Sequence, residues 1–370
     1  MSEPLPAGSQ TSEPLLAVRD LTVRFRTRGG LVTAVDHVSF DLAAGEVLGV
    51  VGESGSGKSV SCLAILRLLG REDVVVTGEV GFRGRDLLQL PESQMRSVRG
   101  REIAMVFQDP MTALTPVYTA GWHLAEAIRM HDKVSRKAAR ARAVQLLGEV
   151  GIPNPERRVD AYPHQFSGGM RQRVVIAMAL ANNPALLIAD EPTTALDVTI
   201  QAQILDLMQR LRRDHGSSVL LVTHDMGVVS QTADRVLVMY GGRVAETGAR
   251  RDVFHEPRHP YTWGLLSSIP RTDRPRTRRL STIPGAPISP LQTAPGCRFA
   301  PRCRFTHDRC AEQPPLVIHG VADADGPDTD GPDVVVAVDG GGHADACWLP
   351  LAERPERRRA ADAAAEEARA

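Results

Sequence analysis

The sequence predicts an α/β fold in which a parallel sheet, covered on both faces, is joined by antiparallel strands, an inserted helical region and a small C-terminal extension. Two continuous apolar runs of strand length, "ALLIADEP" and "SSVLLVTHD", are typical of strands buried on both faces, and "EVLGVV" predicts a short β-branched strand before a glycine loop. Partial alternation in "LLAVRDLTVRF" and "VDHVSFDL" instead indicates antiparallel strands with one buried face. Between the halves of the parallel pattern, "SRKAARARAVQLLGEVGI" predicts an amphipathic helix of the inserted region.

Composition limits the class of protein. The 370 residues, 42% of them hydrophobic, suffice for one main core and an appendage. The 44 basic and 44 acidic side chains cancel, so no net field attracts nucleic acid, and we predict no nucleic-acid partner. The N-terminus shows no charged start before an apolar stretch, and no run reaches the ~18 apolar residues of a membrane span, which predicts a cytosolic protein. In a reducing compartment, clustered cysteines more often bind metal than form disulfides.

A phosphate-binding loop is predicted where "GESGSGKS" follows a strand and precedes a helical apolar pattern. Its glycines let backbone N–H groups turn inward around phosphate oxygens, and the helix that begins there adds the positive end of its dipole. Lys58 is expected to reach the β- and γ-phosphates, and the Ser59 hydroxyl to bind Mg²⁺. The strand and helix on either side argue against a chance match. The predicted nucleotide contacts in this loop are Gly52, Glu53, Ser54, Gly55, Ser56, Gly57, Lys58, Ser59 and Val60.

Adjacent carboxylates end a second predicted strand. Asp190 is expected to hold the Mg²⁺ shell, while Glu191 faces the γ-phosphate and polarises the attacking water. A solvated Asp-Glu pair at a strand end is an equally good interpretation of these two residues alone. The phosphate loop in the same chain favours the catalytic interpretation.

Three further stretches carry polar residues at the ends of predicted elements. "FSGGMRQR" places Ser167, Gly168 and Gly169 before a helix, as a second phosphate-binding end without a lysine. "MVFQDP" and "LLVTHD" place Gln108 and His224 after strands. Taken singly, these are more often a helix cap, a loop residue and a surface histidine. Their order in one chain, together with the phosphate loop, favours function.

In this order the motifs resemble those of the ATP-binding subunits of ABC transporters, over roughly residues 15–265. The resemblance implies a P-loop NTPase fold of the ABC ATPase kind, with an antiparallel β subdomain and a helical subdomain at about 109–180. It implies ATP and Mg²⁺ as ligands. It also implies a head-to-tail sandwich of two such domains, with ATP between one subunit's Walker A loop and the other's signature loop. One set of motifs is present, so a second copy or a paralogue must complete each site.

The resemblance also assigns roles to the residues that match its motifs. Asp190 and Glu191 match the Walker B pair, and Asp197 in "ALD" matches the D-loop. Gln108 matches the Q-loop glutamine, which contacts Mg²⁺ and the γ-phosphate, and His224 matches the switch histidine. Glu191, His224 and Gln108 are therefore the expected catalytic group.

The remaining motif residues are expected to bind nucleotide. Residues 52–59 match the Walker A loop, and Phe25 resembles the aromatic residue that stacks on adenine. Ser167 to Met170 match the core of the signature. Phe166 and Met170 replace the commoner Leu and Gln, but the phosphate-facing Ser-Gly-Gly is intact.

Several features favour an importer subunit among ABC proteins. Chromosome-organising relatives separate the motif halves with long coiled coils, and the stretch between Gln108 and Ser167 is too short for one. Translation-factor relatives carry two motif sets in one chain. "HEPRHPYTWGLLSSIP" resembles the C-terminal extension of dipeptide and oligopeptide importer ATPases, whose marker is matched by His259, Pro260, Tyr261 and Thr262.

The resemblance implies an ATP-driven motor at the cytoplasmic face of the cell membrane, peripherally bound. Its implied partners are a second ABC ATPase subunit, two membrane permease subunits and, indirectly, an extracytoplasmic solute-binding protein. Dipeptides and oligopeptides are the expected solutes, with nickel, glutathione or oligosaccharides as alternatives. A non-transport ABC ATPase is the less favoured interpretation.

Four of the five cysteines gather near the C-terminus: Cys297, Cys303, Cys310 and Cys347. "PLVIHG" and "VVVAVD" could form two arms of a hairpin that returns Cys347 to the others. The segment is too small and polar for a core of its own, so a bound metal would fold it. Zinc is the default for four cysteines, but paired C-x-x-C knuckles are absent, and some members of the resembling subfamily hold a four-iron, four-sulfur cluster here. We favour the cluster, with zinc and free buried thiols as alternatives, and expect Cys62 to be an ordinary core residue.

Changes in composition divide the chain. The first residues are rich in Pro, Ser and Glu, a dense Pro/Arg run begins at Arg271, and the last residues lack an apolar face. The predicted parts are a disordered tail (1–14), the ABC ATP-binding domain (15–265), an extension of the oligopeptide-transporter type with the cysteine cluster (266–350) and a flexible tail (351–370).

Overall fold

A computed structural model of the chain describes residues 13–70, 72–109, 113–194, 197–269, 282–288, 295–318 and 342–367. The predictions of a disordered segment before residue 13, of the Arg-rich boundary at 271–280 and of a hairpin arm at "VVVAVD" lie outside these residues. None of the helices in the described part of the chain is long and apolar enough to cross a bilayer.

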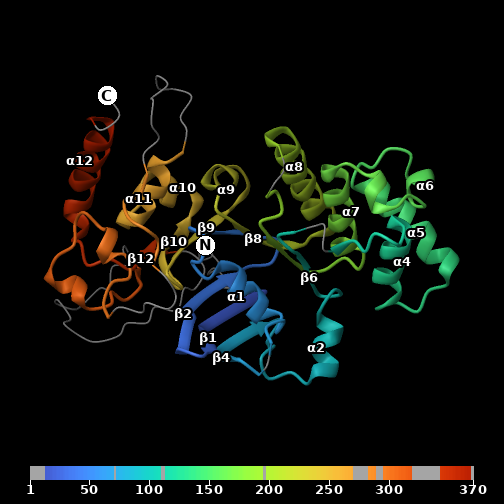
Figure 1. The fold of residues 1–370 in the computed structure, drawn as a ribbon, viewed down its shortest axis with the longest axis horizontal. Helices are drawn as coiled ribbons and strands as arrows, with labels where there is room; N and C mark the ends of the chain where they lie inside the picture. Colours follow the sequence, from blue (N-terminus) through green and yellow to red (C-terminus); the bar gives the residue numbers. More distant parts are fainter. Residues whose placement is uncertain are drawn as a thin grey trace, which may run out of the picture.

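The parallel sheet lies at the centre of the molecule (Figure 1). Its strand order is β11-β12-β10-β9-β3-β8-β7-β6, in which β9, β3, β8, β7 and β6 pair in parallel. Every residue of β3, β7 and β8 is buried, which confirms the prediction of a sheet covered on both faces. The strands are β3 (Val47–Val51), β6 (Ile103–Val106), β7 (Leu186–Asp190), β8 (Ser218–Thr223), β9 (Arg235–Tyr240), β10 (Arg243–Ala249), β11 (Val317–Ile318) and β12 (Ala344–Asp345).

A second, antiparallel sheet packs against one face of the first and has the order β2-β1-β4-β5. Helix α1 (Lys58–Ile65) contacts β1, β2 and β7 and so lies between the sheets (Figure 1). Along β3, Leu48 and Val50 enter the core shared with this sheet, whereas Val47 and Val51 enter the core on the other face. The antiparallel strands are β1 (Leu16–Thr27), β2 (Gly30–Leu42), β4 (Val74–Phe82) and β5 (Arg85–Asp86), followed by helix α2 (Glu92–Val98).

The predicted helical insertion forms a lobe at the β6 edge (Figure 1). Two of its helices begin at side-chain caps: Thr119 accepts from the N–H of Trp122, and Ser135 from that of Ala138. In α5, Leu146 and Leu147 are buried, as the amphipathic pattern predicts. The lobe comprises α4 (Ala120–Arg129), α5 (Arg136–Glu149), α6 (Pro155–Arg158), a 3₁₀ turn (Pro163–Gln165) and α7 (Gly168–Leu180).

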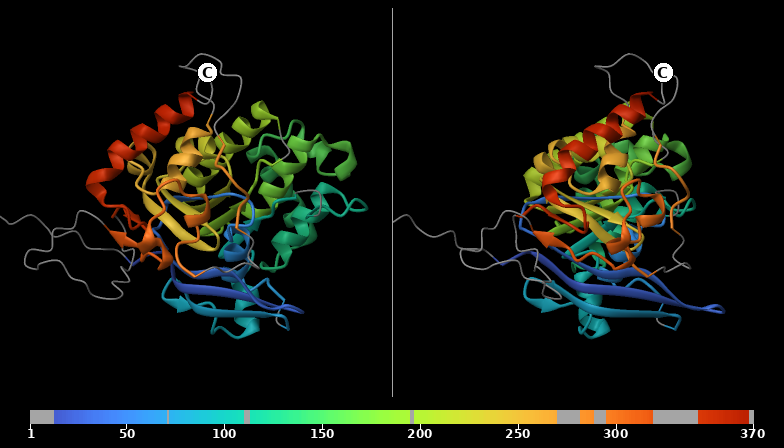
Figure 2. Two further views of the ribbon diagram at one scale, coloured as in Figure 1. Left: turned by 60° about the vertical axis from the view of Figure 1, so that its left-hand side comes forward. Right: turned by 90° about the vertical axis from the view of Figure 1, so that its left-hand side faces the viewer.

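The C-terminal extension is continuous with the main sheet. Strand β12 pairs antiparallel with both β10 and β11. This pairing covers an edge of β10 that would otherwise be exposed. The described part of the predicted flexible tail is a 3₁₀ turn (Leu351–Glu353) followed by helix α12 (Arg354–Glu367). Helix α12 lies beside α11 (Pro260–Ser267; Figure 2), and a buried ion pair between Arg354 and Asp345 fastens it. The remaining elements are α8 (Val198–His215), α9 (Met226–Thr232), α10 (Arg250–His255), α11 (Pro260–Ser267), α12 (Arg354–Glu367) and 3₁₀ turns at Ala300–Arg302, Asp308–Ala311 and Leu351–Glu353.

Candidate functional site

The loop between β3 and α1 has the backbone that a phosphate-binding loop needs. Gly57, the N-cap of α1, has a φ of 99°, and a Cβ there would lie 2.6 Å from the Ala34 carbonyl oxygen. A Cβ on Gly52 would lie 2.2 Å from the Met239 carbonyl oxygen. Both glycines are therefore required for the loop to fit between β2 and β9.

Lys58 curls back over this loop. Its Nζ donates hydrogen bonds to the carbonyl oxygens of Gly52 at 2.8 Å and Glu53 at 2.9 Å. Burial lowers the pKa of Lys58, and the nearby charges of Glu191 and Asp190 partly oppose that shift. The ammonium is thus held within the loop, where an anionic ligand would replace its carbonyl partners.

Ser59 and Asp190 form a pair of oxygen ligands at the start of α1 and the end of β7. Ser59 Oγ donates to Asp190 Oδ1 at 2.9 Å. Asp190 is only 4% exposed, and burial raises its pKa while the Ser59 hydrogen bond opposes the rise. Hard oxygen ligands beside a buried carboxylate suit Mg²⁺, so the residues present fit the expected ion.

Glu191 lies at the centre of a hydrogen-bonded group built from three strand ends. Its Oε2 accepts from Gln108 Nε2 at 3.0 Å and from Thr194 Oγ1 at 2.9 Å, and its Oε1 lies 3.2 Å from His224 Nδ1. Gln108, Glu191 and His224 follow β6, β7 and β8, which are neighbours in the sheet, so their carboxyl ends meet. Burial would raise the pKa of Glu191, but the hydrogen bonds from Thr194 and His224 lower it overall.

Thr194 is a member of this group that the motifs did not indicate. Thr194 lies three residues after Glu191, in a turn where the Thr194 N–H also donates to the Glu191 carbonyl oxygen. This short spacing is the feature of the sequence that could have indicated its role. Glu191 has a φ of 47°, so the turn holds its backbone in the left-handed region.

The predicted signature residues lie elsewhere in the fold. Ser167 caps α7 by accepting from the Met170 N–H at 3.3 Å, and a Cβ on Gly168 would meet open space. Helix α7 packs on β6, α4, α5 and α8, whereas α1 packs on β1, β2 and β7. The chain therefore does not bring its own Ser167, Gly168 and Gly169 to its phosphate loop.

Two further predicted site residues, Phe25 and Asp197, lie outside the phosphate loop and the Glu191 group. Phe25 is half-buried on β1 and lies opposite Val32 of β2. Val32 is two residues from Ala34, whose carbonyl oxygen lies close to Gly57. Phe25 therefore lies toward the end of the hairpin that is near the phosphate loop. Asp197 caps α8 by accepting from the Ile200 N–H at 3.0 Å. That contact is a structural role, and it leaves one carboxylate oxygen for other contacts.

The four C-terminal cysteines line one pocket, together with His259 and His307. Cys310 Sγ lies 3.5 Å from His307 Nδ1, and the β11–β12 pairing returns Cys347 to the other three. Burial raises the pKa of Cys297, Cys303 and Cys347, the last to about 12. Within the described residues, no three His, Cys, Asp or Glu side chains are already arranged to hold one metal ion. Cys62 is buried in α1, as expected for a core residue.

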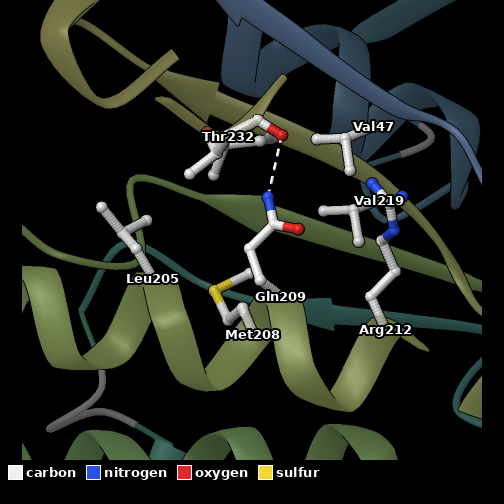
Figure 3. Close-up of a pocket in the computed structure, with 8 residues that line it drawn as sticks. Val47, Leu205, Met208, Gln209, Arg212, Val219 and Thr232 are labelled. Atoms are coloured by element: carbon white, nitrogen blue, oxygen red, sulfur yellow. Dashed lines mark hydrogen bonds between the residues drawn. The ribbon is translucent and has the colours of Figure 1, made fainter. Parts of the chain in front are cut away.

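Another pocket lies between α8 and the sheet (Figure 3). It is lined mainly by apolar side chains such as Val47, Met208 and Val219, and Gln209 crosses it to donate to the Thr232 carbonyl oxygen at 2.8 Å. No residue of the phosphate loop or the Glu191 group borders it. It is a packing gap behind the sheet rather than a nucleotide site.

Comparisons with known proteins agree with this geometry. Residues 35–194 match the family described as ABC transporter, and residues 245–310 match the oligopeptide/dipeptide transporter, C-terminal region. A putative peptide import ATP-binding protein of Brucella abortus (strain 2308) is 52% identical over 309 residues, 84% of this chain and 93% of that protein. The oligopeptide transport ATP-binding protein OppD of Bacillus subtilis (strain 168) is 53% identical over 302 residues, 81% of this chain and 84% of that protein.

Solved structures show the same fold. A dimeric ATP-binding cassette in a post-hydrolysis state, bound to ADP and phosphate, matches with a TM-score of 0.57 and 29% identity, covering 64% of this chain and 99% of that one. The cbiO1 protein of Clostridium perfringens, part of an ABC transporter complex, matches with a TM-score of 0.56 and 27% identity, covering 66% and 92%. The expected α/β ABC ATPase fold is confirmed, and ATP hydrolysis is the activity of this fold and family. The chain belongs to the ATP-binding subunits of ABC transporters, in the branch of the peptide importers.

Proposed function

We propose that this ATPase is the motor of an importer that takes up dipeptides or oligopeptides through two membrane permease subunits. Support comes from relatives that are named as peptide, oligopeptide and dipeptide transport ATP-binding proteins. The subunit acts at the cytoplasmic face of the membrane, and an extracytoplasmic binding protein delivers the solute. ATP binding closes the ATPase dimer and turns the permeases outward, and hydrolysis resets them.

Each ATP is held between two subunits. The observation that carries this proposal is the separation of α1 from α7 within one chain, which leaves the phosphate loop without a signature loop of its own. In a head-to-tail dimer, residues 52–59 of one subunit face Ser167, Gly168 and Gly169 of the other, a copy or a paralogue. The N-terminus of α7 then directs free N–H groups at the γ-phosphate.

The hydrolytic roles follow from the hydrogen bonds of Glu191. Its carboxylate, kept ionised by Thr194 and His224, accepts a proton from the attacking water. Gln108 and His224 hold the carboxylate and border the γ-phosphate. Ser59, Asp190 and Gln108 are the residues that would hold Mg²⁺, which neutralises charge on the β- and γ-phosphates.

Permease docking is assigned to the helical lobe near Gln108. Tyr118 and Trp122 are each 42% exposed, and their rings stack with centroids 3.8 Å apart. Val117 beside them is also exposed. An exposed aromatic pair on a polar lobe suits the insertion of a short permease helix.

The cysteine pocket is proposed to hold a four-iron, four-sulfur cluster, with zinc as the alternative. Support comes from the donor set: four thiols line one pocket, and such clusters take four thiolates. Anaerobic purification should yield a brown protein that contains iron and acid-labile sulfide. Cys303→Ser should lose the iron, whereas Cys62→Ala, a cysteine outside the pocket, should keep it. A colourless protein with stoichiometric zinc would favour zinc, and an unchanged metal content in Cys303→Ser would refute both.

The transport proposal is tested by reconstitution with the permease subunits of the importer. ATPase activity in proteoliposomes should rise when a peptide and its binding protein are added together, and should not rise with either alone. Stimulation by nickel, glutathione or an oligosaccharide instead would reassign the solute. ATPase activity that is indifferent to the permeases would favour a role outside transport.

A further inference from the structure

Glu53, the second residue of the phosphate loop, is held by groups outside the nucleotide motifs. Its backbone N–H donates to the Tyr261 hydroxyl oxygen at 2.8 Å. Its carboxylate accepts from both terminal nitrogens of Arg302, at 2.5 and 3.1 Å. Its carbonyl oxygen accepts from Lys58 Nζ at 2.9 Å. The Ser56 N–H also donates to this carbonyl oxygen, at 3.2 Å. All the polar groups of Glu53 are therefore engaged, and two of its four partners, Tyr261 and Arg302, lie in the C-terminal part of the chain.

Arg302 is a rigid partner for this carboxylate. Its side chain is only 4% exposed, its Nε donates to the Pro284 carbonyl oxygen at 2.8 Å, and its guanidinium lies 5.8 Å from the centroid of the Tyr240 ring. A two-pronged guanidinium–carboxylate pair is both strong and directional. Arg302 thus restricts where the side chain of Glu53, and with it the loop backbone, can lie.

Tyr261 is fixed by the same part of the extension. It is fully buried, and its ring centroid lies 4.6 Å from that of Tyr240 and 5.4 Å from that of Phe299. Phe299 and Arg302 belong to the short segment that also carries Cys297 and Cys303. One segment of the extension therefore supplies Arg302 and packs against Tyr261.

A second set of contacts leads from this segment to the other end of the loop. Arg298 pairs with the Asp36 carboxylate and donates to the Gly241 carbonyl oxygen. The next residue, Gly242, accepts from the Asp36 N–H at 2.8 Å and donates its own N–H to the Ser56 carbonyl oxygen at 3.0 Å. The phosphate loop is thus fastened to the extension near both Glu53 and Ser56.

We propose that the C-terminal extension sets the nucleotide affinity of this ATPase by holding the phosphate loop in its binding conformation, with Arg302 as a positioning residue that acts through Glu53. The inference rests on the assignment of residues 52–59 to the triphosphate. A phosphate loop binds by aligning its N–H groups on phosphate oxygens, so a loop that samples other conformations binds less tightly. Arg302 also neutralises a carboxylate that would otherwise repel the triphosphate.

The change in the Kd for ATP follows from the fraction of time that the phosphate loop spends in its binding conformation. If the loop without Arg302 holds its binding conformation about one tenth of the time, the apparent Kd for ATP rises about tenfold. Arg302 directly precedes Cys303, so the contact with Glu53 and one wall of the cysteine pocket belong to the same short segment.

The test measures the Kd for a fluorescent ATP analogue, together with the melting temperature, in full-length variants. The set comprises Arg302→Met, Arg302→Lys, Glu53→Gln and the double variant Glu53→Gln/Arg302→Met. Arg354→Met is the matched control, because its guanidinium is equally buried but bonds to Asp345, Leu349 and Cys347 within the extension. Lys58→Ala serves as the reference for the loop itself.

Arg302→Met should raise the Kd about tenfold. Arg302→Lys should retain part of the affinity, because lysine keeps the positive charge but cannot form the two-pronged pair with the carboxylate. The double variant should bind no more weakly than Arg302→Met, because the two side chains act as one pair. Arg354→Met should lower the melting temperature and leave the Kd within about twofold of wild type.

A wild-type Kd in Arg302→Met, multiplied losses in the double variant, or an equal rise in Arg354→Met would each overturn the proposal. Undiminished binding in Lys58→Ala would instead show that residues 52–59 do not hold the triphosphate. The failure of the positioning role is therefore distinguishable from the failure of the site assignment.

Discussion

Replacing Glu191 with glutamine isolates the proton-accepting step from everything else at the site. The glutamine side chain has the same shape, and its amide oxygen can still accept from Thr194 Oγ1, which lies 2.9 Å from Glu191 Oε2. Its amide nitrogen can donate to His224 Nδ1, which lies 3.2 Å from Glu191 Oε1, once the imidazole carries its proton on Nε2 instead. The loop after β7 should therefore keep its conformation, and only the capacity to accept a proton is lost.

The expected loss follows from what a positioned base contributes. General-base catalysis typically accelerates a reaction about 10²- to 10⁴-fold, so kcat should fall by that factor in Glu191→Gln. ATP binding should persist, because Lys58 and the phosphate loop are unchanged and because removing a negative charge near the triphosphate reduces repulsion. The variant should thus accumulate with ATP bound.

The assay compares phosphate release by the complex with its permeases and the binding of a fluorescent ATP analogue by the same preparation. Lys58→Ala is the contrasting variant, since it deletes a loop charge and should lose binding itself. A kcat for Glu191→Gln within about tenfold of wild type would remove Glu191 from the base role. Loss of ATP binding in Glu191→Gln would show that the carboxylate is needed to build the site.

Three further predictions concern pH, assembly and stability. The Thr194 hydroxyl lowers the pKa of Glu191, and the carboxylate must be ionised to act, so Thr194→Val should move the acid limb of the kcat–pH profile to higher pH and leave the plateau near neutral pH; an unmoved limb contradicts this. In mixed dimers, Ser167→Arg in one subunit should stop hydrolysis at the partner's phosphate loop, whereas full activity of an isolated monomer would contradict the shared site. Leu146→Ala, on the buried face of α5, should lower the unfolding free energy by about 2–5 kcal/mol in a denaturant titration, and a loss below about 1 kcal/mol would contradict the packing.

The nucleotide motifs could be predicted from the sequence because their chemistry is local. A phosphate loop needs glycines at close approaches, as at Gly52 and Gly57, and a helix that begins with Lys58 and Ser59. Such requirements fall within a few consecutive residues, so they are visible without a fold. The same holds for the buried strands β3, β7 and β8, because a short continuous apolar run is typical of a strand covered on both faces.

The C-terminal part was less predictable, because its structure depends on partners elsewhere. Nothing in "VIHG" or "HADAC" indicates that β11 and β12 extend the main sheet, since two-residue strands carry no periodic pattern. The tail from Arg354 lacks an apolar face, yet its described part is helical. The ion pair between Arg354 and Asp345 and the contact with α11 hold this helix against the rest of the chain.

By itself, the sequence indicated which residues have the chemistry to bind phosphate, to bind Mg²⁺ or to accept a proton, because those abilities belong to short stretches of backbone and single side chains. Only the tertiary structure decided which of these residues meet. The sheet order β6-β7-β8 brings Gln108, Glu191 and His224 to one edge from distant parts of the chain. The folding of the extension onto β10 and β9 places Arg302 against Glu53. Such pairings depend on which surfaces bury one another, and burial is a property of the whole fold rather than of any one segment.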